Sequence, residues 1–134
     1  MQKNFKILTA CFVMFFAGAC LSTLTATRQD WDYVMRTGGL RVEAPVKESV
    51  GKYRIPLTLH ITEAQEINSG LCVRFDHIVA DKSIQFWMIT YLADGKHIPP
   101  ALAISVEDIK PGTYEVSYRN RDGGLIPLGN VELR

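Results

Sequence analysis

The chain has 134 residues, which is enough for one domain and a targeting segment. Its 15 basic and 14 acidic residues are interspersed, and hydrophobic residues make up 47% of the chain. This composition is typical of a globular protein, and the lack of a basic stripe argues against a nucleic-acid-binding protein.

The N-terminal segment differs in composition from the rest of the chain. Lys3 and Lys6 precede an uncharged, mostly apolar run over residues 7–26. A short basic region followed by an apolar region is the pattern of a secretory signal. The sequence therefore predicts an exported protein.

The end of this signal leaves three outcomes open. Small residues at 17–19 precede Cys20 as in a loose bacterial lipobox, so cleavage would leave Cys20 as a lipidated N-terminus. Cleavage by the ordinary signal peptidase would instead give a soluble exported protein, with a signal over residues 1–19 or 1–26. In the third outcome, residues 7–24 remain as a membrane anchor. We favour lipidation at Cys20 and a signal peptide over residues 1–19.

Residues 20–39 are expected to form a linker or tether ahead of the domain. Asp30 can cap a helical turn in this segment, and Gly38 can end that turn. Trp31 and Tyr33 are expected to pack on the domain rather than in a lipid interface. The folded domain is expected over residues 40–134.

Residues 40–134 contain short segments in which apolar and polar residues alternate, which is typical of strands with one buried face. Pro56 predicts an edge or bulged strand, and Pro127 with Gly129 predicts a bulge or a late start in the last strand. Ile84–Leu92 is apolar on both faces and is expected either in the middle of the protein or facing a partner. The expected strands lie within residues 40–44, 53–62, 71–79, 84–92, 101–107, 113–119 and 125–133.

This density of strands, without long helices, predicts an all-β fold. We expect an antiparallel immunoglobulin-like (Greek-key) β-sandwich of about seven strands. A transthyretin-like sandwich or a small barrel would give nearly the same pattern.

A corner before the strand at 113–119 supports the sandwich. Pro111 and Gly112 form a turn pair, and Tyr114 follows just inside the strand. This is the arrangement of the tyrosine corner in immunoglobulin-like domains. We expect Tyr114 to be buried, with its hydroxyl bonded to backbone near Asp108–Gly112.

The stretch Ile109–Gly124, IKPGTYEVSYRNRDGG, resembles the terminal hairpin of CopC-like periplasmic copper-binding sandwiches. In that family a copper-ligating His follows Asp-Gly, where this chain has Gly124. The family's N-terminal His has no counterpart near Cys20 or Thr27. The resemblance therefore implies the sandwich architecture and not copper transport.

The chain carries little recognisable site chemistry. His60, His77 and His97 lie on three separate segments and lack the close spacing of a metal site. We interpret them as ordinary surface or core residues and expect neither a metal nor a cofactor. The sequence has no nucleophile elbow, zinc-protease motif or phosphate-binding loop, so we expect no enzyme.

These observations favour an envelope lipoprotein in the periplasm or at the outer membrane. Its sandwich would bind another envelope protein, as an assembly factor, adaptor, pilotin-like chaperone or inhibitor. It would contact the membrane through its N-terminal lipid or segment and would not bind nucleic acid. The alternative is a periplasmic carrier of a metal or small ligand that uses the three histidines.

Candidate protein-binding residues lie on two loops. One is the turn after the strand at 113–119, which presents Arg119, Arg121 and Asp122. The other has Lys96 and His97 at its crest. Guanidinium groups offer bidentate contacts, so we expect a partner to dock at the two arginines. The alternative interpretation is that both loops are merely solvated turns.

Overall fold

The computed structural model describes residues 26–60, 71–92 and 101–134. Cys20, Lys96 and His97 lie outside the described residues, and so does the signal segment over residues 1–19. Within the described ranges, no helix is long and apolar enough to cross a membrane.

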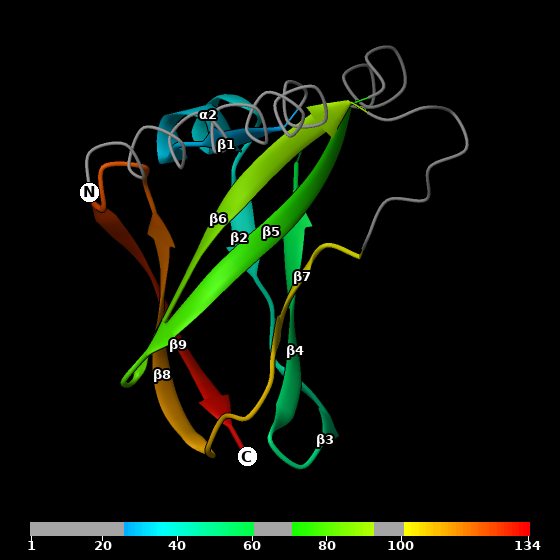
Figure 1. Ribbon diagram of the computed structural model, residues 1–134, viewed down its shortest axis with the longest axis vertical. Helices are drawn as coiled ribbons and strands as arrows, with labels where there is room; N and C mark the ends of the chain where they lie inside the picture. The colour runs from blue at the N-terminus through cyan, green and yellow to red at the C-terminus, as the bar shows by residue number, and fades with distance from the viewer. Residues whose placement is uncertain (1–25, 61–70, 93–100) are drawn as a thin grey trace, which may run out of the picture.

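The fold is an all-β sandwich of two packed sheets, as the sequence predicts (Figure 1). The larger sheet contains β1 (Thr27–Gln29), β5 (Leu71–Ala80), β6 (Ser83–Leu92), β8 (Gly112–Arg119) and β9 (Leu125–Leu133). The smaller sheet contains β2 (Leu40–Val42), β3 (Val46–Ser49), β4 (Lys52–Leu59) and β7 (Ala103–Val106). The short helix α2 (Trp31–Arg36) follows β1.

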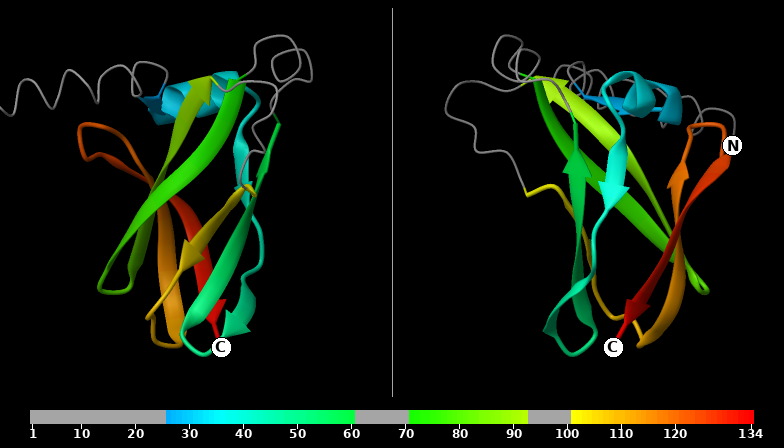
Figure 2. Two further views of the ribbon diagram at one scale, coloured as in Figure 1. Left: turned by 45° about the vertical axis from the view of Figure 1, so that its right-hand side comes forward. Right: turned by 180° about the vertical axis from the view of Figure 1, so that it is seen from behind.

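The larger sheet runs in the order β5–β6–β8–β9, with β1 beside the C-terminal half of β6. The position of β6 in the middle confirms the expectation drawn from its two apolar faces. One pair departs from the predicted antiparallel sandwich, because β6 and β8 are parallel. The chain leaves β6, passes through β7 in the other sheet and returns in the same direction, so this pair cannot be antiparallel (Figure 2).

The smaller sheet corrects the prediction for Pro56. Its strand, β4, is central: β2 and β3 pair with one edge and β7 with the other. Pro56 is tolerated there because it faces the interruption between β2 and β3, where Pro45 breaks the neighbouring strand. Only the Pro56 carbonyl is needed on that side, and it accepts the Glu43 N–H at 2.9 Å.

The domain begins earlier than residue 40, so the prediction of a linker up to residue 39 is wrong for 27–39. β1 pairs with β6, and Val34 of α2 is fully buried in the core. Trp31 and Tyr33 pack against the same core, as expected. This segment packs on the domain because it covers apolar side chains at one end of the sandwich.

The core lies between the sheets, and its largest fully buried side chains include Tyr53, Phe86, Met88 and Tyr118. The tyrosine corner is confirmed. Tyr114 is 3% exposed, and its hydroxyl donates to the Lys110 carbonyl at 2.7 Å.

Candidate functional site

The turn that carries the predicted binding residues is fastened to the N-terminal segment. The Asp30 carboxylate accepts the Arg121 backbone N–H at 2.9 Å and both Nε and Nη2 of its guanidinium at 3.3 Å. These hydrogen bonds, from the backbone first and the guanidinium second, hold the pKa of Asp30 below its usual value. The Asp30 side chain therefore ties the start of α2 to this turn instead of capping the helix.

Further bonds strengthen the same attachment. Asn120 Oδ1 accepts the Trp31 N–H at 2.8 Å. The Arg28 guanidinium lies 4.2 Å from the centre of the Trp87 ring and donates to the Arg119 and Asn120 carbonyls. A cation over an indole face is an attractive arrangement that also buries part of the Arg28 stem. Residues about 90 positions apart are thereby joined.

The predicted site residues on this turn all have partners within the chain. Arg119 Nη1 donates to Gln85 Oε1 at 3.0 Å, and Arg121 binds Asp30. Asp122 Oδ1 accepts the Gly124 N–H at 2.8 Å and so shapes the turn itself. Lys96 and His97 cannot be placed beside them, because they lie outside the described residues. Docking of a partner at this turn stays a prediction.

The described histidines are not gathered into a metal site. His60 is exposed after β4, and His77 is half-buried on β5. Burial lowers the pKa of His77, and the neighbouring Asp76 opposes that shift. In the described part of the chain, no group of three His, Cys, Asp or Glu side chains could hold a metal ion.

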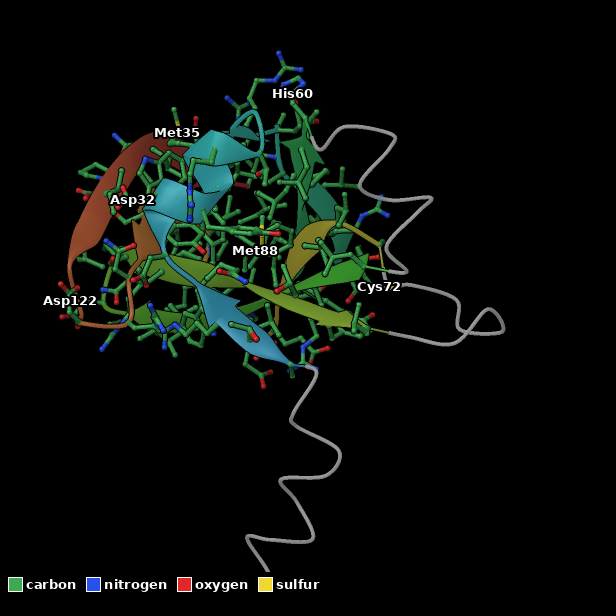
Figure 3. The ribbon with its side chains drawn as sticks, turned by 90° about the horizontal axis from the view of Figure 1, so that it is seen from above. Asp32, Met35, His60, Cys72, Met88 and Asp122 are labelled. Atoms are coloured by element: carbon green, nitrogen blue, oxygen red, sulfur yellow. The ribbon has the colours of Figure 1, made fainter. Side chains whose placement is uncertain are left out.

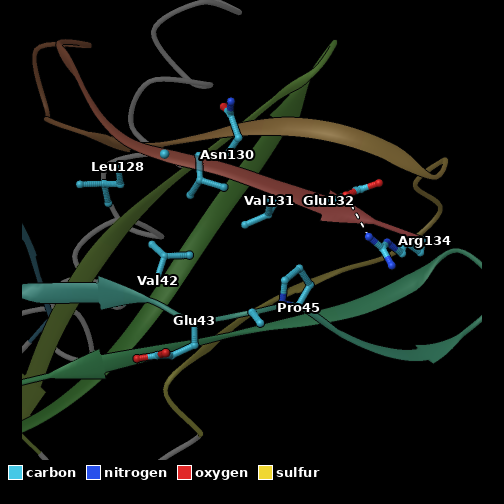
Figure 4. A pocket seen from close by; sticks show the side chains of 11 residues that line it. Val42, Glu43, Pro45, Leu128, Asn130, Val131, Glu132 and Arg134 are labelled. Atoms are coloured by element: carbon cyan, nitrogen blue, oxygen red, sulfur yellow. Dashed lines mark hydrogen bonds and ion pairs between the residues drawn. The ribbon is translucent and has the colours of Figure 1, made fainter.

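A groove of about 450 Å³ opens beside β9 (Figure 4); we call it the β9 groove. One wall is the Val42–Pro45 break between β2 and β3, and the other is β9. Val42, Leu128 and Val131 are its apolar side chains, and Val116 of β8 lies deeper. The groove separates the outer edges of the two sheets, which pair with no other strand among the described residues.

The rim of the β9 groove carries charges that are already paired. Glu43 binds Arg41 at 2.7 Å and the Thr58 hydroxyl at 2.9 Å. Glu132 binds Arg134 at 3.4 Å. The Arg41 contact, with a further contribution from Thr58, lowers the pKa of Glu43. The groove therefore offers a mixed polar and apolar surface whose charged side chains are paired within the chain.

The shape of β9 explains why this groove exists. Pro127 pairs with Ser117 and Gly129 with Val116, so Leu128 is an extra residue, which confirms the predicted bulge. Gly129 has φ of +126°, a conformation that a side chain would strain. A bulge bends the strand that carries it, and this bulge lies beside the groove. The alternation of apolar and polar residues predicts that Val131 and Leu133 point inward. It does not show that β2 lies across the groove from β9.

A second cavity, of about 660 Å³, follows the other side of the sandwich along β5 and β7; we call it the β5 groove. Arg74, Asp76 and Ile78 of β5 line one side, and Arg54 and Ser105 line the other. Figure 3 shows Cys72 of β5 and Asp122 on opposite sides of the molecule. The two grooves thus accompany the two opposite edges of the larger sheet.

Comparison with family models, with curated proteins and with solved structures gives no match to this chain. The resemblance to CopC-like domains therefore stays a prediction.

Proposed function

We propose that this protein is an exported envelope lipoprotein whose sandwich binds an extended segment of another envelope protein in the β9 groove. Export and lipid attachment rest on Lys3, Lys6 and the small residues before Cys20. Leu21, and not Asp, follows Cys20, so outer-membrane sorting is expected if the organism is Gram-negative. The sequence contains no motif that supports an enzymatic function.

The β9 groove is the observation that carries the binding role. It lies between two unpaired strand edges, which are surfaces through which sandwiches bind extended segments. Apolar side chains contribute to its lining, and the charged groups on its rim are paired within the chain. The expected ligand is therefore an extended segment that contributes apolar side chains. Pro127 and the bulge limit backbone pairing with β9, so side-chain contacts should dominate.

Photo-crosslinking in cells tests the binding role. A photoreactive residue at Asn130, an exposed position on the groove, should trap one defined envelope protein. The matched control is Val50, which is 93% exposed on the turn between β3 and β4. A product from Arg121 but not from Asn130 would move the site to the turn. Equal products from all three positions would contradict specific binding.

Metabolic labelling with a palmitate analogue tests the lipid. The full chain should be labelled, and Cys20→Ser should abolish the label. A mature N-terminus at Thr27, or label that persists in Cys20→Ser, would contradict lipidation at Cys20.

A further inference from the structure

The outer edge of β5 is unusually regular for a strand at the border of a sheet. All ten residues pair with β6 without a register shift. The strand contains no Pro and no Lys, two residues that commonly guard an exposed edge, and its charged residues are Arg74 and Asp76. Among the described strands, only β6 pairs with it. From Val73 to Ala80, this edge is therefore competent to accept another strand.

The centre of β5 is self-complementary in charge. It reads Arg74, Phe75, Asp76, so reversing the strand about Phe75 exchanges a cation for an anion. We propose that β5 pairs antiparallel with β5 of a second copy of this chain, around a two-fold axis at Phe75. Arg74 then lies opposite Asp76 of the second copy, and the symmetry repeats this pair.

The two charges are poorly matched within one chain. Arg74 Nη2 and Asp76 Oδ2 are 4.0 Å apart, and their side chains are 46% and 48% exposed. Residues directly opposite on antiparallel strands have Cβ atoms about 4.5–5.5 Å apart, and opposite charges there attract. Pairing of two copies therefore gives each of these residues a second, oppositely charged neighbour.

The ends of β5 are complementary too, through apolar contact. Ile78 and Val79 are 38% and 42% exposed although both are large hydrophobic residues. In the proposed register, Ile78 faces Cys72 of the second copy and Val79 faces Leu71 of the second copy. These contacts remove apolar surface from water at both ends of the paired edge.

The proposed pairing fits the symmetry rules for oligomers and goes beyond the proposed function. A two-fold axis makes the same surface serve both copies, which is the commonest arrangement in soluble homodimers. The second copy would cover the β5 groove and extend the larger sheet. The β9 groove lies at the opposite edge of that sheet and stays open to another protein.

Charge exchange provides the test. Two differently tagged copies of the full chain are co-expressed, solubilised in detergent and recovered through one tag. Wild-type copies should recover each other. Arg74→Asp paired with itself, and Asp76→Arg paired with itself, each place like charges opposite and should lower recovery at least about tenfold, or about 1.4 kcal/mol. Co-expression of Arg74→Asp with Asp76→Arg should restore recovery, because opposite charges then face each other at both positions.

The restoration separates the interface from folding, since an unfolded variant could not be rescued by its complement. Unchanged recovery with the single variants, or absent recovery of the complementary pair, would overturn the proposal. Absence of wild-type recovery would overturn it as well. Crosslinking from Asn130 would still report on the proposed function in each of these cases.

Disulfide trapping checks the register. In the Ile78→Cys variant, the introduced thiol should face the Cys72 thiol of the second copy and form a disulfide-linked dimer on oxidation. The matched control is Val79→Cys, which keeps every other cysteine and lies on the opposite face of the strand. Equal crosslinking of the two variants would contradict the two-fold axis at Phe75.

Discussion

The two edges of the larger sheet differ in what holds them in place. Near its end, β9 buries Val131 and Leu133 in the core, at 8% and 1% exposure. Of the ten β5 residues only Val73 is buried, so pairing with β6 holds that strand. The difference suggests two kinds of recognition. β5 offers a regular backbone edge, whereas the bulged β9 offers apolar side chains.

The largest expected effect is on the free energy of unfolding, and it reports how much core packing stabilises each edge strand. Leu133→Ala removes a fully packed side chain and should destabilise the fold by about 2–5 kcal/mol in urea unfolding. Val79→Ala on β5 changes an exposed side chain and, at a protein concentration low enough to keep the chain monomeric, should stay within about 0.5 kcal/mol. Similar losses for both variants would remove the contrast between the edges.

The corner under the end of β9 gives the next effect. Tyr114 lies opposite Val131 in the β8–β9 ladder and donates its hydroxyl to the Lys110 carbonyl. Tyr114→Phe keeps the ring but leaves this acceptor unpaired, so we expect a loss of about 1–3 kcal/mol. An unchanged urea midpoint would show that the corner does not support β9.

The smallest effect is a pH dependence on β5. Burial lowers the pKa of His77 from 6.5, against the opposing effect of Asp76, so the folded chain binds protons at His77 less readily than the unfolded chain. Its contribution to stability should be complete above about pH 6.5 and decrease as pH falls through 6.5 toward the lower folded pKa.

The measurement compares the thermal midpoints of wild type and His77→Gln between pH 7.5 and pH 5. These limits lie about one unit above and more than one unit below the ordinary pKa of histidine. The wild-type midpoint should fall more steeply than that of the variant. Parallel curves would exclude His77 as the source of the dependence.

Short-range patterns made much of the fold predictable. The bond between Tyr114 and the Lys110 carbonyl spans four residues, and the turn chemistry around it is visible in the sequence. Alternation likewise predicted that β4 and β8 each have one buried face. These features depend on neighbours along the chain, and the sequence displays such neighbours directly.

Long-range pairings could not be read in the same way. Tyr118 donates its hydroxyl to the Gln29 carbonyl and accepts the Met88 N–H, and Asp30 binds Arg121. The local sequence pattern of Thr27–Gly39 does not indicate these distant partners, so the segment was predicted to be a linker. The parallel β6–β8 pair escaped prediction for a related reason, because alternation shows which face is buried but not which strand lies beside it.

The grooves were missed because each is formed by edges distant in the sequence. Val42 and Leu128 line the β9 groove from strands in different sheets. The two loop arginines were predicted to bind a partner because they are cations on a turn. The structure gives both of them partners within the chain. Free charge is visible in a sequence, whereas its neutralisation by a remote residue is not.

The central claim is that β5 pairs with a second copy while the β9 groove remains open. Amide hydrogen exchange of the detergent-solubilised full chain, at two protein concentrations, tests it most directly. Because dimerisation depends on concentration, protection of Leu71–Ala80 should rise at the higher concentration, while that of Leu125–Leu133 should not change. Protection that is independent of concentration in β5, or that rises equally in β9, would contradict the account.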